Sequence, residues 1–209
     1  MASSFAAQIP AILDIVRQIH PKTVLDIGKG FGKYGFLIHE YIGIDNNRKL
    51  DPSLSMKAQS DVRIDAVEVD PDLMLPHLNF FYDRIFEGDV LKIYPTLPSY
   101  ELILMIDIIE HIDKEEALIM LRDFISKKSM ILVATPEKFF EQHLYESQFE
   151  NHVSHWTVKD FNKLGCLSYQ KVQAGMIYLL SPQKVNYSGF GSELGKKLKR
   201  IGWAIRHEL

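Results

Sequence analysis

The stretch that decides the fold is Val24-Leu25-Asp26-Ile27-Gly28-Lys29-Gly30-Phe31-Gly32-Lys33-Tyr34-Gly35. An apolar run ends in an acid, glycine then occupies every second position, and a helical pattern follows. This order predicts a strand, a glycine-rich turn and a helix. Glycine lets a ligand approach the backbone because it has no Cβ and tolerates positive φ. The stretch therefore predicts a ligand site at the end of the first strand, beside the first N–H groups of the helix.

Length, charge and cysteine content restrict the classes of protein that the sequence can form. The 209 residues are enough for one α/β domain, which we expect over 1–182, followed by a tail over 183–209. The net charge of -3 argues against binding of polyanions by the whole surface. The single cysteine, Cys166, excludes a disulfide framework and a cysteine zinc site. No apolar run reaches the ~18 residues of a membrane span and no signal peptide pattern is present, so we expect a cytoplasmic protein.

Apolar runs alternate with helical patterns along the chain. This predicts an α/β fold with a Rossmann-like doubly wound sheet, mostly parallel with an antiparallel edge strand. The expected strands are 24–27, 64–69, 84–87, 102–106, 130–134, 170–174 and 176–180, and the expected helices are 9–19, 33–41, 72–81, 115–125 and a short one ending at 161–164. The helix over 115–125 should turn Leu118, Leu121 and Ile125 inward. The last two strands have no helix between them, which favours the antiparallel pair.

Two segments depart from this rhythm. Residues from about 42 to 60 are polar and rich in turn formers, and form an insertion of roughly 15 residues that is either a surface loop or a lid or acceptor-binding element. In the tail, Leu194, Leu198, Ile201 and Ile205 share one helical face among many lysines and arginines. Such a basic amphipathic helix packs on its own domain, forms a homodimer or makes peripheral membrane contact.

Four acids follow four successive strands, namely Asp26, Glu68, Asp89 and Asp107. Ligands of open α/β sheets bind outside the carboxyl ends of the strands, so these acids are candidate binding residues. The alternative is that each acid caps the helix that follows it.

The acid followed by Gly-x-Gly-x-Gly, with acids at the next three strand ends, resembles the class I S-adenosylmethionine-dependent methyltransferases over about 22–134. The resemblance implies that S-adenosylmethionine binds at Asp26, Gly28, Gly30 and Gly32. Lys29 departs from the family pattern, because many relatives carry a small residue or cysteine there.

The same resemblance assigns roles at the other strand ends. Glu68 would accept from the ribose hydroxyls, with Asp70 as the alternative acid. Asp89 would accept from the adenine amino group beside the N–H of Val90, and Asp107 would face the amino-acid end of the cofactor.

The acceptor side is predicted in Asn151-His152-Val153-Ser154-His155-Trp156-Thr157, which resembles that of several O-methyltransferases of this class. We interpret His152 and His155 as general base and substrate contact, acting on a small-molecule or glycan/lipid hydroxyl. The alternative is structural: Trp156 and His155 anchor the segment, and Thr157 caps a helix with Asp160.

A metal-assisted alternative rests on Asp107, Glu110, His111 and His152. Small-RNA 2′-hydroxyl methyltransferases and some quinone-biosynthesis O-methyltransferases resemble this chain in an acid-x-x-Glu-His pattern. Relatives without a metal also carry Glu-His there, so we assign no metal ligand and keep the divalent metal as an alternative. Two further alternatives are a noncatalytic regulatory domain that binds an adenosyl ligand and an oxidoreductase that binds a dinucleotide. No strong nucleic-acid signal is present, since the tail lacks base-stacking aromatics on a broad basic face.

Overall fold

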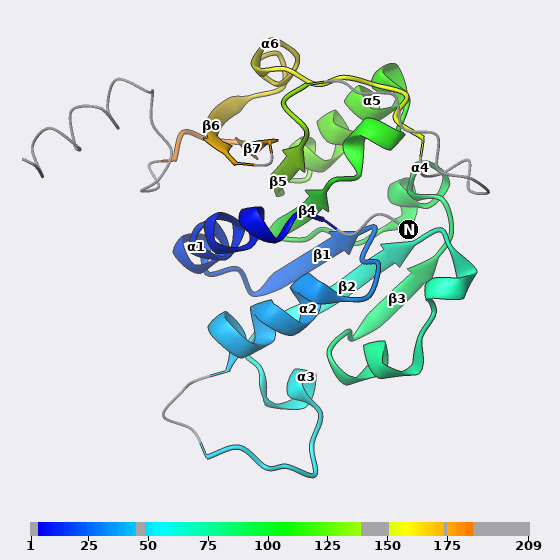
Figure 1. Ribbon diagram of the computed structural model, residues 1–209, viewed down its shortest axis with the longest axis vertical. Helices are drawn as coiled ribbons and strands as arrows, with labels where there is room; N and C mark the ends of the chain where they lie inside the picture. Colours follow the sequence, from blue (N-terminus) through cyan, green and yellow to red (C-terminus); the bar gives the residue numbers. More distant parts are fainter. Residues whose placement is uncertain (1–3, 45–48, 139–150, 174, 186–209) are drawn as a thin grey trace, which may run out of the picture.

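The computed structural model describes residues 4–44, 49–138, 151–173 and 175–185, and a seven-stranded sheet forms its centre (Figure 1). The strands are β1 Thr23–Ile27, β2 Arg63–Glu68, β3 Arg84–Glu87, β4 Leu102–Ile106, β5 Met130–Thr135, β6 Cys166–Val172 and β7 Gly175–Ser181. Their order across the sheet is β3-β2-β1-β4-β5-β7-β6. Strands β1 to β5 run parallel, and β7 is antiparallel to both β5 and β6. The predicted fold class is confirmed.

The sheet separates two apolar cores because successive side chains of a strand point to opposite faces. On β1, Val24 belongs to one core and Leu25 to the other, and neither is exposed. All five residues of β4 are buried, as expected for a central parallel strand covered on both faces. Strand β6 begins at Cys166, four residues before its predicted start, because its antiparallel pairing with β7 extends to Ser181.

Helices cover both faces of the sheet (Figure 1). They are α1 Ile9–Ile19, α2 Lys33–Ile38, α3 Met56–Gln59, α4 Val90–Ile93, α5 Lys114–Ser126 and α6 Val158–Phe161. Helix α5 begins where the Asp113 carboxylate accepts from the backbone N–H groups of Glu115 and Glu116. Its buried residues are Ala117, Met120, Leu121 and Phe124. Of the three residues predicted to face inward, only Leu121 is fully buried; Leu118 and Ile125 pack at the edge of this stripe.

The predicted helix over 72–81 is wrong. Two short 3-10 helices, Pro71–Leu73 and Pro76–Phe80, occupy this segment. Pro76 has no N–H, and its ring would clash with the carbonyl of Asp72 in a continuous helix. The helical spacing of the apolar residues was therefore overridden by one proline.

The described part of the insertion lies between α2 and β2 and is held by side-chain hydrogen bonds. The Gln59 amide accepts from the backbone N–H of Asp51 at 2.7 Å and donates to its carbonyl at 3.1 Å. Lys57 donates to the carbonyl of Tyr82 at 2.6 Å. The segment leads into the amino end of β2, while the carboxyl ends of the strands lie at the opposite edge of the sheet (Figure 1).

No helix in the described ranges is long and apolar enough to cross a membrane. The predicted amphipathic helix of the tail lies outside the described residues, which end at 185.

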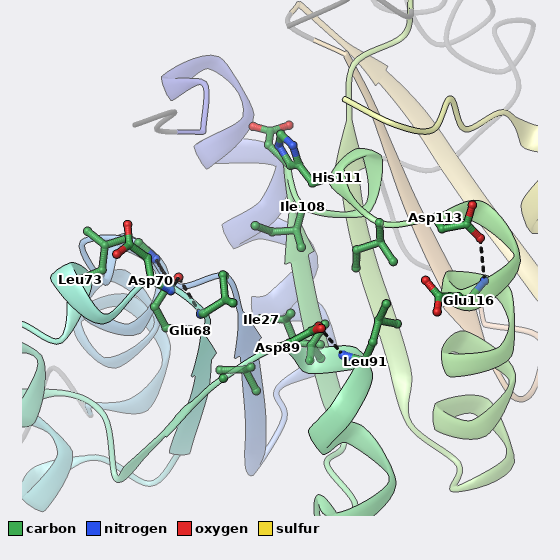
Figure 2. Close-up of a pocket in the computed structure, with 18 residues that line it drawn as sticks. Ile27, Glu68, Asp70, Leu73, Asp89, Leu91, Ile108, His111, Asp113 and Glu116 are labelled. Carbon is green, nitrogen blue, oxygen red and sulfur yellow. Dashed lines mark hydrogen bonds between the residues drawn. The ribbon is translucent and has the colours of Figure 1, made fainter. Parts of the chain in front are cut away.

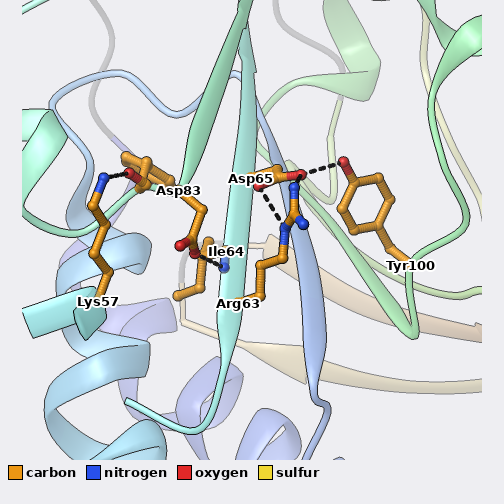
Figure 3. Close-up of polar contacts among 7 residues, drawn as sticks. Lys57, Arg63, Ile64, Asp65, Asp83 and Tyr100 are labelled. Carbon is orange, nitrogen blue, oxygen red and sulfur yellow. Dashed lines mark hydrogen bonds and ion pairs between the residues drawn. The ribbon is translucent and has the colours of Figure 1, made fainter. Parts of the chain in front are cut away.

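A buried acid on β2 has a structural role (Figure 3). The carboxylate of Asp65, with no exposed surface, accepts from the Arg63 guanidinium at 3.2 and 2.9 Å. It also accepts from the Tyr100 hydroxyl at 2.8 Å. These contacts join β2 to the segment before β4. A buried carboxylate is stable only when paired and hydrogen-bonded in this way.

Replacing Asp65 by alanine is expected to lower the free energy of unfolding by about 3 kcal/mol, because a buried hydroxyl and a guanidinium lose their acceptor. Asp61→Ala is the matched control: Asp61 is exposed, so the change should stay within about 0.5 kcal/mol. Urea unfolding of both variants measures the difference. Equal effects of the two substitutions would contradict the structural role.

Candidate functional site

A cavity of about 320 Å³, called here the main cavity, opens at the carboxyl ends of β1 to β4 (Figure 2). Its size is typical of a small-molecule site. Six of the predicted site residues line it, from four different segments: Gly28, Gly30, Glu68, Asp89, Val90 and Asp107. The structure thus brings the four strand ends together in one cavity.

The glycines of the turn have two different roles. All three have positive φ, +71° at Gly28, +52° at Gly30 and +82° at Gly32. A Cβ at Gly28 would lie 2.1 Å from Ile108 Cδ1, and one at Gly32 would lie 2.4 Å from Phe81 Cε2. A Cβ at Gly30 would meet no atom within 4 Å among the described residues and would stand in the open cavity. Gly28 and Gly32 therefore permit close packing, while Gly30 leaves room for a ligand.

Glu68 is the better oriented of the two candidate acids after β2. Its Oε2 accepts from the N–H of Gly30 at 3.0 Å, which joins β2 to the turn. Its Oε1 accepts from the N–H groups of Val69 and Asp70 at 3.0 and 3.1 Å. A carboxylate offers about four acceptor positions, so capacity remains for a ligand hydroxyl. Asp70 also lines the cavity, but its carboxylate caps the next 3-10 helix.

Lys29 is not among the residues that line the main cavity. Its buried ammonium donates to the carbonyl of Leu73 at 2.8 Å and lies 3.4 Å from that of Gly30. Burial lowers its pKa, while the charges of Glu68 and Asp26 act in the opposite direction. This lysine therefore links the glycine turn to the segment after β2, which explains the departure from the family pattern.

Asp89 caps a helix and also lies in the wall of the main cavity. One oxygen accepts from the N–H of Leu91 at 3.0 Å and caps α4, and the other lies 3.7 Å from Lys92 Nζ. Asp89 and Val90 also line the main cavity. Helix capping and ligand binding are compatible at this position.

Asp26 lies behind the glycine turn and does not line the main cavity. Its carboxylate accepts from the Tyr82 hydroxyl at 2.5 Å. Burial raises the pKa of Asp26 to about 6, although the hydrogen bond from Tyr82 acts in the opposite direction. Through this hydrogen bond with Tyr82, Asp26 stabilises the end of β1 from which the glycine turn begins.

The raised pKa of Asp26 predicts a pH effect on stability. The folded protein retains this proton between the ordinary pKa of 3.8 and about 6, whereas the unfolded chain loses it at the lower value. This stabilising contribution is present below pH 3.8 and is lost as pH rises through 6, an effect of about 3 kcal/mol. Urea unfolding at pH 4 and pH 7 should show that loss relative to Asp26→Asn, in which the other titrating groups are retained. Parallel pH profiles would contradict the assignment.

Asp107 follows β4 in a strained conformation, with φ of +54°. Its Oδ1 accepts from the Gln8 amide at 3.2 Å, whereas its Oδ2 is buried without a hydrogen-bond partner among the described residues. Asp107 lines the main cavity and also a smaller one of about 70 Å³, called here the side cavity. Four residues are common to the two linings: Gly28, Gly30, Asp107 and Ile108.

Glu110, His111 and His152 form a cluster beside the main cavity. One ligand atom from each lies within 4.8 Å of the others. Burial raises the pKa of Glu110 to about 8, and the Thr135 hydroxyl donates to its carboxylate at 3.1 Å. The rings of His111 and His152 meet edge to face with centroids 4.9 Å apart. His111 lines the main cavity, so the cluster adjoins the region where the four strand ends meet (Figure 2).

The segment that carries His152 is anchored by its neighbours. Trp156 is buried and donates to the carbonyl of Ile109 at 3.1 Å and to Ser154 at 2.7 Å. Thr157 and Asp160 form the predicted capping box of α6. His155 Nε2 lies 3.2 Å from the carbonyl oxygen of Glu137, and His155 is not one of the three clustered residues. Its predicted role as a substrate contact stays a prediction.

Comparison with known proteins gives similarity in structure alone. No protein-family model matches the chain, and no curated protein matches its sequence. The methyltransferase domain of bacterial CtHen1 matches with a TM-score of 0.51 and 17% identity, over 84% of this chain and 97% of that one. Small RNA methyltransferase HEN1 matches with a TM-score of 0.59 and 16% identity, over 91% of this chain and 27% of that one. Monomeric WbdD matches with a TM-score of 0.57 and 15% identity, over 90% of this chain and 44% of that one.

The chain has the class I methyltransferase fold. The recognition made from the glycine turn and the four acids is thus confirmed at the level of the fold.

The donor of this fold family, S-adenosylmethionine, fits the residues of the two cavities. Gly30 leaves backbone open to a ligand, and Glu68 offers acceptor capacity for hydroxyl groups. The Oδ2 atom of Asp107 is buried and has no hydrogen-bond partner among the described residues, so a ligand can donate to it. The chemistry of the walls therefore matches a ligand with a ribose and an ammonium group.

A divalent cation fits the cluster. One carboxylate and two imidazoles are ligand types used by divalent transition metals, and one ligand atom from each lies within 4.8 Å of the others. Thr135 holds the carboxylate from behind, as outer-shell groups do at metal sites.

Sequence reasoning missed three polar residues: Lys33, which lines the side cavity, and Gln8 and Tyr82, which contact acids in its wall. Gln8 and Lys33 are far from Asp107 in sequence, and Tyr82 is far from Asp26. No local motif marks them, because each acts through a contact that only the packed fold creates.

Proposed function

We propose that the protein transfers a methyl group from S-adenosylmethionine to an oxygen atom, with Glu110, His111 and His152 holding a divalent cation at the acceptor. The observation that carries this proposal is the cluster itself: three ligand atoms lie within 4.8 Å, and His111 also lines the main cavity. The acceptor is a small-molecule or glycan/lipid hydroxyl, since the net charge is -3 and Asp70, Asp113 and Glu116 line the same cavity.

On the donor side, the chain's residues bind and orient. Glu68 accepts from a ribose hydroxyl, Asp89 accepts from the adenine amino group, and Gly30 leaves space for the backbone to approach the ligand. Bound S-adenosylmethionine supplies an activated methyl group on a positively charged sulfur. Methyl transfer then depends chiefly on holding donor and acceptor in line.

On the acceptor side, the cluster prepares the hydroxyl. A divalent cation there would lower the pKa of the acceptor hydroxyl and orient it. Glu110 brings the negative charge and Thr135 orients its carboxylate through the 3.1 Å hydrogen bond. This proposal gives His152 the role of a ligand rather than that of the general base expected from the sequence.

Two measurements test the proposal. Calorimetric titration with S-adenosylmethionine, S-adenosylhomocysteine and NAD should show binding of the two adenosyl compounds alone, and binding of NAD alone would contradict the donor. Transfer of labelled methyl to a panel of hydroxylated acceptors should stop on chelation and return on addition of Mg²⁺ or Mn²⁺. Activity unchanged by chelation would return His152 to the role of general base. Adenosyl binding without transfer to any acceptor would favour a noncatalytic regulatory domain.

A second candidate function is methylation of an RNA 2′-hydroxyl. Two of the similar structures carry the name Hen1, one of them described as a small RNA methyltransferase. The Asp107-x-x-Glu110-His111 pattern and His152 support the same comparison. Including short RNA in the acceptor panel separates the two candidates.

A further inference from the structure

The glycine turn and the start of α2 pack directly against residues 77–82, called here the support segment, which follows β2 in the chain. A Cβ at Gly32 would lie 2.4 Å from Phe81 Cε2, and a Cβ at Gly35 would lie 2.5 Å from Tyr82 Cζ. Both rings therefore lie against glycine backbone, with no side chain in between. Because protein interiors contain few voids, a shift of either ring would displace the turn or the start of α2.

The hydroxyl of Tyr82 adds a polar contact to this packing. It donates to the buried carboxylate of Asp26 at 2.5 Å, on the strand that leads into the turn. Asp26 lines the side cavity together with Gly28 and Gly30. No residue of the support segment lines either of the two cavities in the described part of the chain. The segment therefore contacts the proposed donor site through the turn and through Asp26.

Two side chains from other elements hold the backbone of the support segment, and the first is His39. It begins the π-helix His39–Gly43, which continues α2, and it is fully buried. Its Nε2 lies 2.7 Å from the carbonyl oxygen of Phe81; since a carbonyl only accepts, Nε2 carries the proton. Its Nδ1 is buried without a hydrogen-bond partner among the described residues, and burial lowers the pKa of the ring. His39 is therefore a neutral donor to the support segment.

The second is Lys57, in α3 of the insertion between α2 and β2. This half-buried residue donates from its ammonium group to the carbonyl of Tyr82 at 2.6 Å (Figure 3). The insertion is tied to the rest of the domain nearby, because the N–H of Asp61 donates to the carbonyl of Gly43 at 2.8 Å. None of the insertion's described residues lines either cavity. Lys57 nevertheless touches a residue that itself packs against the glycine backbone.

We infer that Lys57 and His39 are positioning residues of the proposed donor site. By holding the carbonyls of Tyr82 and Phe81, they fix the two rings against the glycine backbone and aim the Tyr82 hydroxyl at Asp26. The insertion then supports the donor site from outside the cavities and is not a lid over the acceptor. This inference rests on the proposed function, since it concerns the same donor.

Calorimetric titration with S-adenosylhomocysteine tests the role of Lys57. Lys57→Met removes the donor to Tyr82 and keeps an unbranched stem, so it should weaken the ligand by about three- to tenfold. Lys57→Arg should retain most of the affinity, because a guanidinium also donates to a carbonyl. Lys49→Met is the matched control: Lys49 is an exposed lysine of the same insertion, and its loss changes the net charge equally. Its affinity should equal that of the wild type.

His39 is tested in the same way. His39→Leu removes the donor to Phe81 and should weaken S-adenosylhomocysteine by a similar factor. His39→Gln retains an amide donor and should restore part of the affinity. Thermal unfolding of every variant shows that it is folded at the temperature of the titration, and the Lys57 variants test the inference on their own if His39→Leu is not.

The carboxyl group of Asp26 provides a spectroscopic readout that a purely stabilising role would leave unchanged. The hydrogen bond from Tyr82 lowers the pKa of Asp26, so a misplaced hydroxyl should let this pKa rise. Carbon-13 NMR of the carboxyl group follows the titration in the free protein. Tyr82→Phe gives the full effect, and Lys57→Met should show part of it in the same direction. Glu68 and Lys29, whose charges also act on Asp26, are retained in all variants.

The outcomes separate this inference from the proposed function. Wild-type affinity for S-adenosylhomocysteine in Lys57→Met would overturn the inference, even if its unfolding temperature falls. A wild-type protein that does not bind S-adenosylhomocysteine contradicts the proposed function itself. In that case the Asp26 titration decides on the positioning role: a shift in Lys57→Met supports it, and an unchanged titration contradicts it.

Discussion

Replacing Glu110 by glutamine is expected to weaken binding of Mn²⁺ by about 100-fold or more and to abolish metal-stimulated methyl transfer. The substitution keeps the shape of the side chain and removes its negative charge. Loss of an outer-shell partner alone costs a metal site about 10- to 100-fold, so loss of a direct ligand should reach or exceed the upper end of that range. Titration of Mn²⁺ monitored by electron paramagnetic resonance measures the affinity without any knowledge of the acceptor.

Glu116→Gln is the matched control for this experiment. Glu116 also lines the main cavity but is not one of the three clustered residues, so its substitution should leave Mn²⁺ binding unchanged. Binding of S-adenosylhomocysteine should survive in both variants, because neither acid is assigned to the donor. Equal Mn²⁺ affinity of wild type and Glu110→Gln would remove the cation from the proposed mechanism.

Replacing Glu68 by alanine is expected to weaken S-adenosylhomocysteine by about 10- to 100-fold, equivalent to about 1–3 kcal/mol. The ribose hydroxyls lose a buried acceptor, and the backbone N–H groups of Gly30, Val69 and Asp70 lose theirs as well. Calorimetry measures the affinity. Glu68→Gln, which keeps the shape of the acid, should lie between wild type and the alanine variant.

Asp70→Ala serves as the comparison for Glu68. Its carboxylate caps a 3-10 helix and is not bonded to the glycine turn, so a smaller loss of affinity is expected. A larger loss for Asp70→Ala than for Glu68→Ala would show that Asp70 is the ribose acid. Equal affinities of both variants and wild type would contradict a ribose contact at either residue.

Much of the fold could be predicted because its signals are local. Apolar runs and the absence of a helix between the last two strands indicated a mostly parallel sheet with an antiparallel pair at one edge. The observed pairing of the strands agrees. The helix predicted over 72–81 was wrong because Pro76 interrupts it despite the favourable spacing of the apolar residues. The inward face of α5 was predicted incompletely: Leu118, Leu121 and Ile125 do pack in or against the core, but its fully buried residues also include Ala117, Met120 and Phe124. Sequence spacing leaves the rotation of a helix on its sheet open.

The residues proposed to bind the donor could also be predicted largely from local sequence signals. Each of these residues ends a strand or lies within a few residues after one: Gly28, Gly30, Glu68, Asp89 and Asp107. Parallel strands align their carboxyl ends at one edge of the sheet. The contact made by the Lys29 side chain could not be predicted from nearby sequence. Its contact with Leu73 spans 44 residues and depends on how the segment after β2 folds back over the turn.

The sequence by itself determined the class of fold and the edge of the sheet where a ligand binds, because apolar periodicity and glycine conformation depend on neighbouring residues. It left a metal site of Asp107, Glu110, His111 and His152 as one alternative among several, and the cluster in the described residues contains the last three of them. Only the tertiary structure decided that their ligand atoms converge within 4.8 Å and that Gln8 meets Asp107 across 99 residues of chain. Such contacts depend on the packing of whole elements, which local spacing does not encode. The glycine turn of residues 28–32 therefore marks the proposed donor site, and the packed fold marks the proposed acceptor side.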